Sequence, residues 1–294
     1  KKGKKCTPAL DAGKGHILDL QNKKPVRIDA FFPVLHGTYG EDGTIQGLFE
    51  MMNIPYVGCS VLGSAAGMDK DVMKRLFWQR GLPVVKWMTF YDNEDPEKIK
   101  RAILKNFRFP VFVKPVNLGS SVGISRVENR RQILGAVREA FLYDFKIIIE
   151  QGYDIREIEC SVLGNFRCVT SQPGEIVPHG DSFYSYKAKY ENTGSELFIP
   201  AKLDQKTARK IRDYAVRAFQ ALEGKGMARV DFFVTKKGNR IFVNELNTIP
   251  GFTSISMFPK MFEKSGLKYP RLIDKLFRLA LEIHKKRNSK KYSH

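Results

Sequence analysis

Apolar residues near the start of the chain fall into two short runs separated by a segment with helical spacing. Residues 1–25 are polar and weakly patterned, and the first run then covers residues 26–35. After a glycine-rich turn at residues 36–43, residues 44–50 have the spacing of an amphipathic helix, and residues 54–58 form the second run. Strand, helix and strand in this order predict a parallel α/β unit, although two strands are few for an independent sheet.

A second group of elements follows up to residue 152. Residues 69–80 predict a helix that ends at Gly81, and its apolar face carries Val72, Met73, Leu76 and Phe77. Asp95 as an N-cap and Pro96 at the first helical position predict the start of another helix. The remaining pattern predicts strands at 109–114, from 124 onward and at 147–150, with a helix at 131–143. We expect this block to form a small α+β domain.

The rest of the chain is expected to combine antiparallel strands with helices. Apolar residues alternate from residue 157 onward, which is typical of an antiparallel strand. Residues 179–197 are polar and rich in tyrosine, and loops of this length are usually functional lids or disordered segments. The pattern further predicts helices at 204–223 and 271–286 and a hairpin at 228–251.

Composition limits the class of protein. The chain has 294 residues, 43% of them hydrophobic, which is enough for a substantial core. It contains no apolar run of the roughly 18 residues that a membrane span needs. The net charge of +19 could indicate nucleic-acid binding, but the lysines are spread out and dense only at the two ends, so a solvated basic surface is the better interpretation. No CxxC pair or zinc-site spacing occurs, which indicates free thiols in a reducing cytoplasm for Cys6, Cys59, Cys160 and Cys168.

Polar residues in the predicted hairpin carry the candidate metal chemistry. Because side chains alternate between the two faces of a strand, Arg229 and Asp231 share one face, as do Glu245 and Asn247. A turn centred on Gly238 would place Asp231 opposite Glu245 and Arg229 opposite Asn247. Oxygen donors without cysteine or histidine suit Mg²⁺ or Mn²⁺ beside phosphate groups. The alternative is a solvated polar face on an edge hairpin.

Other segments suggest a phosphate or nucleoside site. Small residues at 119–123 predict a loop whose backbone N–H groups could approach phosphate, but it is no Walker loop, and a plain hairpin turn is the alternative. Lys114 lies before this loop at a strand end, where it could act as a point charge for phosphate. Lys70 could do the same from its helix, or be a surface residue. Residues that could bind a nucleoside, or simply be solvated at strand ends, are Glu150, Gln151 and Glu157.

Motifs in a fixed order along the chain together resemble one known family. They are residues 36–43 (HGTYGEDG), 68–70 (MDK), 113–115 (VKP), 118–123 (LGSSVG), 183–190 (FYSYKAKY), 229–231 (RVD) and 244–256 (NELNTIPGFTSIS). This set resembles the D-alanine–D-alanine ligases of the ATP-grasp superfamily. The resemblance implies an α/β chain of the α+β ATP-grasp type. Its parts would be a truncated parallel α/β N-terminal domain at 1–67, a central subdomain at 68–152 and a C-terminal subdomain at 153–294, with a lid loop at 179–197 and a metal hairpin at 228–251.

The resemblance also implies roles for individual residues. ATP would be bound by Lys70, Lys114, Ser121, Glu150, Gln151, Glu157, Phe183, Lys189 and Asn244. Two Mg²⁺ or Mn²⁺ ions would be held by Asp231, Glu245 and Asn247. The D-alanine substrates would contact His36, Ser256 and Met257. The catalytic groups would be Arg229 and the Gly251 N–H, which stabilise oxygen charge, with Ser120 and Tyr190, which tie the lid to the substrate region.

The implied reaction is the ATP-dependent joining of two D-alanine molecules through D-alanyl phosphate, for peptidoglycan synthesis. The resemblance implies a cytoplasmic homodimer with no nucleic-acid or membrane partner. Alternatives are a D-alanine–D-lactate or D-alanine–D-serine ligase, a non-catalytic nucleotide-binding protein, and a basic RNA-binding protein that keeps the fold. The family begins with a glycine-rich segment that carries a catalytic glutamate, and nothing before residue 26 matches it. We therefore expect the subsite for the first D-alanine to be incomplete in this chain.

Overall fold

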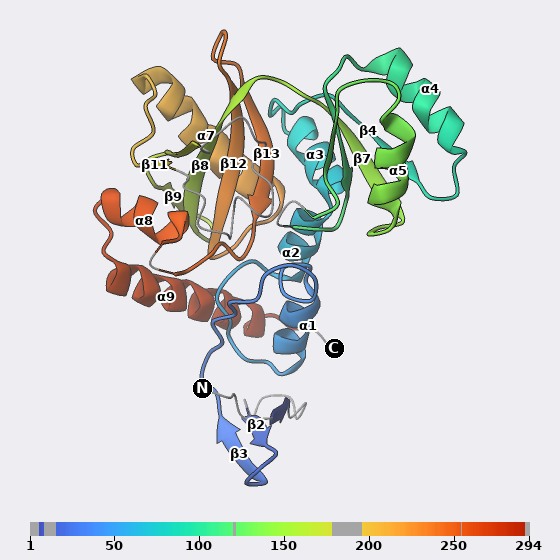
Figure 1. Ribbon diagram of the computed structural model, residues 1–294. Coiled ribbons are helices and arrows are strands. Elements are labelled where there is room, and N and C mark those ends of the chain that lie inside the picture. The colour runs from blue at the N-terminus through green and yellow to red at the C-terminus, as the bar shows by residue number, and fades with distance from the viewer. Residues whose placement is uncertain (1–5, 9–15, 120–121, 178–195, 254, 292–294) are drawn as a thin grey trace.

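The computed structural model describes residues 6–8, 16–119, 122–177, 196–253 and 255–291, and Figure 1 shows their arrangement. Two antiparallel sheets form the body of the molecule, and the helix α3 (Lys70–Gln79) lies between them. A third, small sheet lies at the N-terminal end. The two large sheets and α3 position the candidate site.

The six-stranded sheet has the order β11-β10-β8-β12-β13, with β9 paired to β8. Its strands are β8 (Ile155–Gly164), β9 (Cys168–Thr170), β10 (Gly174–Val177), β11 (Glu196–Phe198), β12 (Met227–Thr235) and β13 (Ile241–Asn247). Alternate residues of β12, such as Val230 and Phe232, are buried in one core cluster with Ile211 and Phe219 of α7 (Gln205–Ala221). The opposite face of β12 is therefore left for polar residues.

The four-stranded sheet has the order β4-β7-β5-β6, and all its pairs are antiparallel. Its strands are β4 (Trp87–Tyr91), β5 (Val111–Pro115), β6 (Ser125–Val127) and β7 (Lys146–Gln151). The helices α4 (Pro96–Asn106) and α5 (Ile133–Phe141) share a hydrophobic core with it. The predicted helix start is confirmed, because Asp95 caps α4 through the Glu97 N–H and Pro96 occupies the first turn. The strand β4 was not predicted.

The helix α3 follows α2 (Val61–Met68), which the sequence pattern did not predict. The expected apolar face of α3 is partly wrong: Val72 is exposed, whereas Lys70 and Lys74 are buried together with Met73 and Phe77. The buried face of α3 therefore keeps the normal helical spacing. It includes two lysines, because this face of the helix contacts the neighbouring sheets.

The C-terminal helices α8 (Met257–Lys264) and α9 (Tyr269–Asn288) pack beneath the six-stranded sheet (Figure 1). Their core includes Phe258, Leu272 and Leu276, and it also takes up Val57 from the N-terminal part of the chain. The predicted amphipathic helix at 271–286 is thus confirmed within α9. Among the helices that the structure describes, none is long and apolar enough to cross a membrane.

The N-terminal part differs most from expectation. Its sheet consists of the antiparallel strands β1 (Cys6–Pro8), β2 (His16–Asp19) and β3 (Lys24–Arg27), in a region that showed only a weak pattern. The predicted strand at 26–35 is wrong beyond Arg27, the last residue of β3, and Pro33, which lacks an N–H, cannot donate to a strand ladder there. The predicted parallel pairing is limited to one bridge, between Phe31 and Tyr56. Between these two residues the chain passes through residues 36–43 into the helix α1 (Thr44–Met51).

Candidate active site

The two residue pairs predicted for the hairpin β12–β13 are present, with a one-residue shift in register between Asp231 and Phe232. Asp231 lies opposite Glu245, and Arg229 lies opposite Asn247. The Asn247 side chain donates from Nδ2 to Asp231 Oδ2 at 2.9 Å. These residues are partly buried, while their neighbours on the other face are buried in the core. The hairpin therefore presents a partly shielded polar surface at the edge of the sheet.

Arg229 is the centre of charge on this surface. Its guanidinium donates to both oxygens of Asp231 at 2.7 Å and lies 3.2 Å from Glu159 Oε2. Burial works against the charged form, but the carboxylates of Asp231, Glu159 and Glu245 raise the pKa of Arg229 well above its ordinary value. The arginine is thus a permanent positive charge held among carboxylates, which suits it to stabilise negative charge on a nearby oxygen.

Glu150 forms a second charged group at the end of β7. Its carboxylate lies 2.6 Å from Lys114 Nζ and 2.9 Å from Lys74 Nζ. Burial alone would raise the pKa of Glu150, but the charges of Lys114 and Lys74 lower it to about 2. The sequence analysis predicted Glu150 and Lys114 as ATP-binding residues, and the structure brings them together on adjacent strands.

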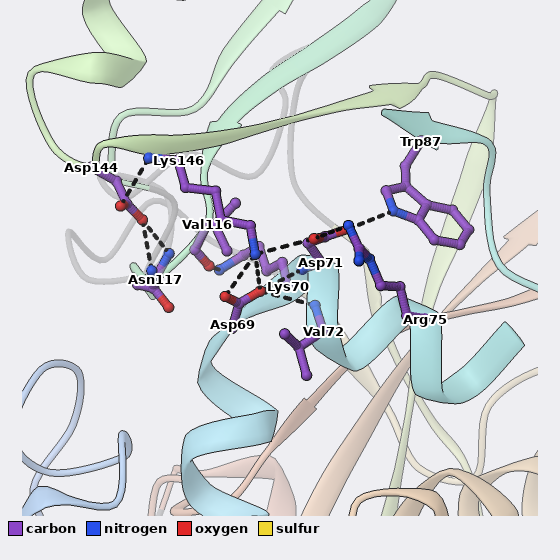
Figure 2. A network of polar contacts seen from close by, with 10 residues as sticks. All are labelled: Asp69, Lys70, Asp71, Val72, Arg75, Trp87, Val116, Asn117, Asp144 and Lys146. Carbon is purple, nitrogen blue, oxygen red and sulfur yellow. Dashed lines mark hydrogen bonds and ion pairs between the residues drawn. The ribbon is translucent and has the colours of Figure 1, made fainter. Parts of the chain in front are cut away.

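Lys70 lies in the first turn of α3, which is fixed to the four-stranded sheet by a network of polar contacts (Figure 2). Lys146 Nζ, on β7, lies 2.9 Å from Asp69 Oδ2 and 3.1 Å from Asp71 Oδ2. Asp69 is also the N-cap of α3, because its side chain accepts the backbone N–H groups of Asp71 and Val72. The start of the helix therefore cannot move independently of β7.

The same network holds the backbone that precedes the predicted phosphate loop (Figure 2). Asp144 accepts from the backbone N–H of Asn117 at 2.8 Å and from its side-chain Nδ2 at 3.0 Å. Lys70 Nζ donates to the carbonyls of Val116, at 3.4 Å, and Leu118. Burial lowers the pKa of Lys70. The ammonium of Lys70 thus lies directly beside the loop, as expected for a phosphate-binding lysine.

The glycine-rich segment after His36 brings a carboxylate, Glu41, toward the hairpin. Glu41 Oε2 accepts from the Gly37 N–H at 2.6 Å, and the Thr248 hydroxyl donates to the Glu41 carbonyl at 3.4 Å. Burial raises the pKa of Glu41, and the charges of Arg229 and Glu245 also act on this carboxylate. His36 itself is exposed. The glycine-rich segment therefore forms one wall of the site, with Glu41 as its titratable group.

The segment after β13 brings Gly251 and Ser256 together. A side chain at Gly251 would place its Cβ 2.7 Å from Ser256 Oγ, so it would displace the Ser256 hydroxyl from its present position. Ser256 Oγ in turn contacts the Thr253 hydroxyl at 2.8 Å. Met257 is different, since its side chain is buried against Ile176 and Met261 and could offer a ligand only its backbone.

Two other predicted residues have structural contacts of their own. Gln151 donates from Nε2 to the Arg108 carbonyl at 2.8 Å, and its backbone N–H donates to the Lys86 carbonyl at 2.9 Å. That N–H is therefore not available to a nucleotide base. Glu157 is partly buried in β8, opposite Phe233 of β12. The predicted residues that lie outside the described parts of the chain are Ser120, Ser121, Phe183, Lys189 and Tyr190.

A divalent metal fits the donor set of the hairpin in its chemistry. Asp231, Glu245 and Asn247 offer oxygen atoms on one face, as Mg²⁺ or Mn²⁺ prefers. Both Asp231 oxygens contact Arg229 here, so an ion at this carboxylate would compete with the guanidinium. Within the described ranges, no group of three or more His, Cys, Asp or Glu is arranged to hold a metal. The third donor would therefore have to be the amide of Asn247.

Sequence reasoning missed Lys74, Glu159 and Glu41. Glu159 is two residues from Glu157 on the same face of β8, so strand alternation could have indicated it. Glu41 lies within a motif that was noted but not assigned. Lys74 gave no signal, because a lysine four residues after Lys70 on a helix is ordinarily a solvated residue.

Two antiparallel sheets that enclose buried lysines and a carboxylate–arginine hairpin have the arrangement expected for the ATP-grasp fold. Comparison with known proteins agrees. Sequence models of the D-ala D-ala ligase N-terminus and C-terminus match residues 5–59 and 76–278. A D-alanine--D-alanine ligase of Caldicellulosiruptor bescii is 53% identical over 293 residues, which cover 98% of this chain and 80% of that protein. The chain belongs to the D-alanine–D-alanine ligase family, and it is a ligase that forms a C–N bond.

Solved structures support the same assignment. The D-alanine-D-alanine ligase from Coxiella burnetii superposes with a TM-score of 0.87 at 40% identity, over 97% of this chain and 76% of that chain. The VanG D-Ala:D-Ser ligase from Enterococcus faecalis superposes with a TM-score of 0.86 at 36% identity, over 94% of this chain and 79% of that chain. The likeness in fold therefore extends to ligases named for different second substrates.

Proposed function

We propose that this chain joins two D-alanine molecules into D-alanyl-D-alanine at the expense of ATP, for peptidoglycan synthesis. The observation that carries the proposal is the pairing of Arg229 and Asp231 with Asn247 and Glu245 across one hairpin. Charged and amide groups gathered on one partly buried strand face, with Arg229 strongly perturbed by its carboxylate neighbours, are typical of a functional site.

The reaction would proceed in two steps that share one site. The carboxylate of the first D-alanine attacks the γ-phosphate of ATP, which gives D-alanyl phosphate and ADP. The amine of the second D-alanine then attacks the acyl carbon, and phosphate leaves. Arg229 and the Gly251 N–H would stabilise the oxygen of the acyl carbon as charge develops. Lys70 and Lys114 would orient the phosphates, and Ser256 would contact the second D-alanine.

Two Mg²⁺ or Mn²⁺ ions would offset negative charge on the phosphates and on the leaving oxygen when bound. The donors that this chain offers are Asp231, Glu245 and Asn247. Glu245 adds a full negative charge and Asn247 a neutral oxygen, so the set balances part of the ionic charge. Arg229, which contacts both Asp231 and Glu159, would supply a further positive charge beside these donors.

The second substrate is the point on which related ligases differ. Identity of 53% to a protein named D-alanine--D-alanine ligase favours D-alanine, while the VanG likeness keeps D-serine as the second candidate. Tyr190 and Ser120, which lie outside the described residues, would take part in this selection. The proposed homodimer and cytoplasmic location stay predictions, which size-exclusion chromatography with light scattering and cell fractionation would test.

A phosphate-release assay tests the proposal directly. The purified chain is supplied with ATP and Mg²⁺ and with no amino acid, with D-alanine alone, or with D-alanine and an excess of D-serine or D-lactate, and the products are identified by mass spectrometry. We expect phosphate release only when D-alanine is present, and D-alanyl-D-alanine as the main product in every such reaction. Nucleotide binding without any product would instead identify a non-catalytic nucleotide-binding protein.

A further inference from the structure

Lys74 is a fully buried lysine between the two large sheets, and the reaction scheme above gives it no role. It is four residues after Lys70, so both side chains project from the same side of α3. Only 1% of the Lys74 side chain is exposed. A buried ammonium costs several kcal/mol of desolvation unless fixed partners compensate it. Such a residue needs a physical reason for its presence.

The partners of Lys74 come from both sheets. Its Nζ lies 2.9 Å from Glu150 Oε1 on β7 and donates to the Asn244 carbonyl on β13 at 3.1 Å. The other oxygen of Glu150 contacts Lys114. One ammonium therefore connects the proposed nucleotide-binding pair to the strand that supplies the proposed metal donors. In Figure 1, α3 lies between these two sheets.

The shape of β13 explains why the Asn244 carbonyl is available. The register shifts between Asp231 and Phe232, which pair with Glu245 and Val243, so Asn244 has no partner on β12. Such a bulge leaves one residue outside the hydrogen-bond ladder of the two strands and changes the direction in which its polar groups point. Because β13 is the edge strand of the sheet, the carbonyl can turn toward α3 and accept from Lys74.

The charges of this cluster also suit an anionic ligand. Lys74 and Lys114 share the single carboxylate of Glu150, so the three side chains together carry one excess positive charge. Lys74 offsets part of the negative charge of Glu150 from the interior of the protein. The carboxylate therefore does not fully neutralise the positive charge of Lys114. Without Lys74, Glu150 would pair with Lys114 only and would cancel the charge that a phosphate would meet.

We propose that Lys74 is a positioning residue, which fixes the Glu150–Lys114 pair relative to the bulged strand that carries Glu245 and Asn247. It cannot contact a ligand itself, because its ammonium is enclosed by protein atoms. It acts through Glu150 on the nucleotide and through Asn244 on the neighbouring metal donors. This inference rests on the proposed function of the site.

Steady-state kinetics of Lys74→Met test the inference, with phosphate release as the readout. Methionine keeps most of the volume and removes the charge. Loss of a charge-assisted hydrogen bond corresponds to about a tenfold change. We expect the KM for ATP to rise by about that factor and the Mg²⁺ concentration at half-maximal rate to rise by about threefold. The KM for D-alanine should stay within about twofold, since Lys74 touches nothing near Ser256.

Lys225→Met is the matched control. Lys225 also donates to two main-chain carbonyls, those of Glu223 and Gly224 at 3.2 Å, but it has no contact with Glu150 or Asn244. We expect this variant to keep both the KM for ATP and the Mg²⁺ dependence of wild type. Lys74→Arg restores the positive charge, but it does not place one nitrogen atom between Glu150 and the Asn244 carbonyl. It should therefore recover part of the affinity for ATP.

The inference is overturned if folded Lys74→Met keeps its KM for ATP and its Mg²⁺ dependence, or if all kinetic constants change together. If Lys74→Met is insoluble, Lys74→Arg decides: an unchanged KM for ATP would contradict the bridge, and a selective rise would support it. Wild type is measured in the same assay. If wild type releases no phosphate with D-alanine, the proposed function has failed, and calorimetric ATP titration of the same variants still tests the role of Lys74.

Discussion

Replacement of Glu150 by glutamine keeps the volume of the side chain but removes the charge that Lys74 and Lys114 share. Only 2% of the Glu150 side chain is exposed, so water cannot replace the lost partner. The pKa of Glu150 falls from 4.5 to about 2 on folding, which corresponds to about 3 kcal/mol in favour of the ionised form. Breaking a buried ion pair typically costs about 3–5 kcal/mol. We therefore expect Glu150→Gln to lower the free energy of unfolding by about 3 kcal/mol at neutral pH.

The pH dependence of this loss has a definite sign. Because the folded pKa of Glu150 is depressed, its stabilising contribution is complete above the unfolded pKa near 4.5 and is lost as pH falls toward 2. Urea unfolding of wild type and variant across this range should show the difference shrinking with acidification. Other carboxylates titrate in both proteins, so the difference between the two isolates Glu150.

Glu128→Gln is the control for this experiment. Glu128 pairs with Arg126 at 2.8 Å, but both side chains are about half exposed, and such pairs contribute less than about 1 kcal/mol. Two results would refute the reasoning about Glu150. One is a loss below about 1 kcal/mol at neutral pH, and the other is a loss that does not change with pH.

Three further substitutions have defined outcomes. Glu245→Gln removes a charge from the proposed metal donors and should lower turnover about a hundredfold or more, so a rate within about threefold of wild type at saturating Mg²⁺ would contradict that role. Gly251→Ala places a Cβ 2.7 Å from Ser256 Oγ and should raise the KM for D-alanine about tenfold, measured by phosphate release at fixed ATP. Gly135→Ala, at an exposed site in α5 with no atom within 4 Å, should raise the free energy of unfolding by about 0.5–1 kcal/mol in urea and leave the kinetic constants unchanged.

Local patterns in the sequence were sufficient for the hairpin and for the helix starts. The pairing of Asp231 with Glu245 was predicted from a turn at Gly238, all within about twenty residues, although the pair also depends on the register shift between Asp231 and Phe232, which the sequence pattern did not indicate. The cap at Asp95 likewise depends on neighbours only, namely the N–H of Glu97. Strand alternation and helix capping are short-range effects, so the residues themselves specify them wherever the element is placed.

Packing between distant segments decided the rest. Lys74 meets the Asn244 carbonyl across 170 positions of sequence, and the Glu41 carbonyl meets Thr248 across 207. Neither contact can be recognised from a periodic pattern in the sequence. A buried lysine, for example, has the same spacing on its helix as an exposed one. Its burial has meaning only once the two sheets enclose α3 and Glu150 supplies the opposite charge. Short-range patterns specified the hairpin, its polar face and several helix starts, whereas only the packing of distant segments specified which charges are enclosed together.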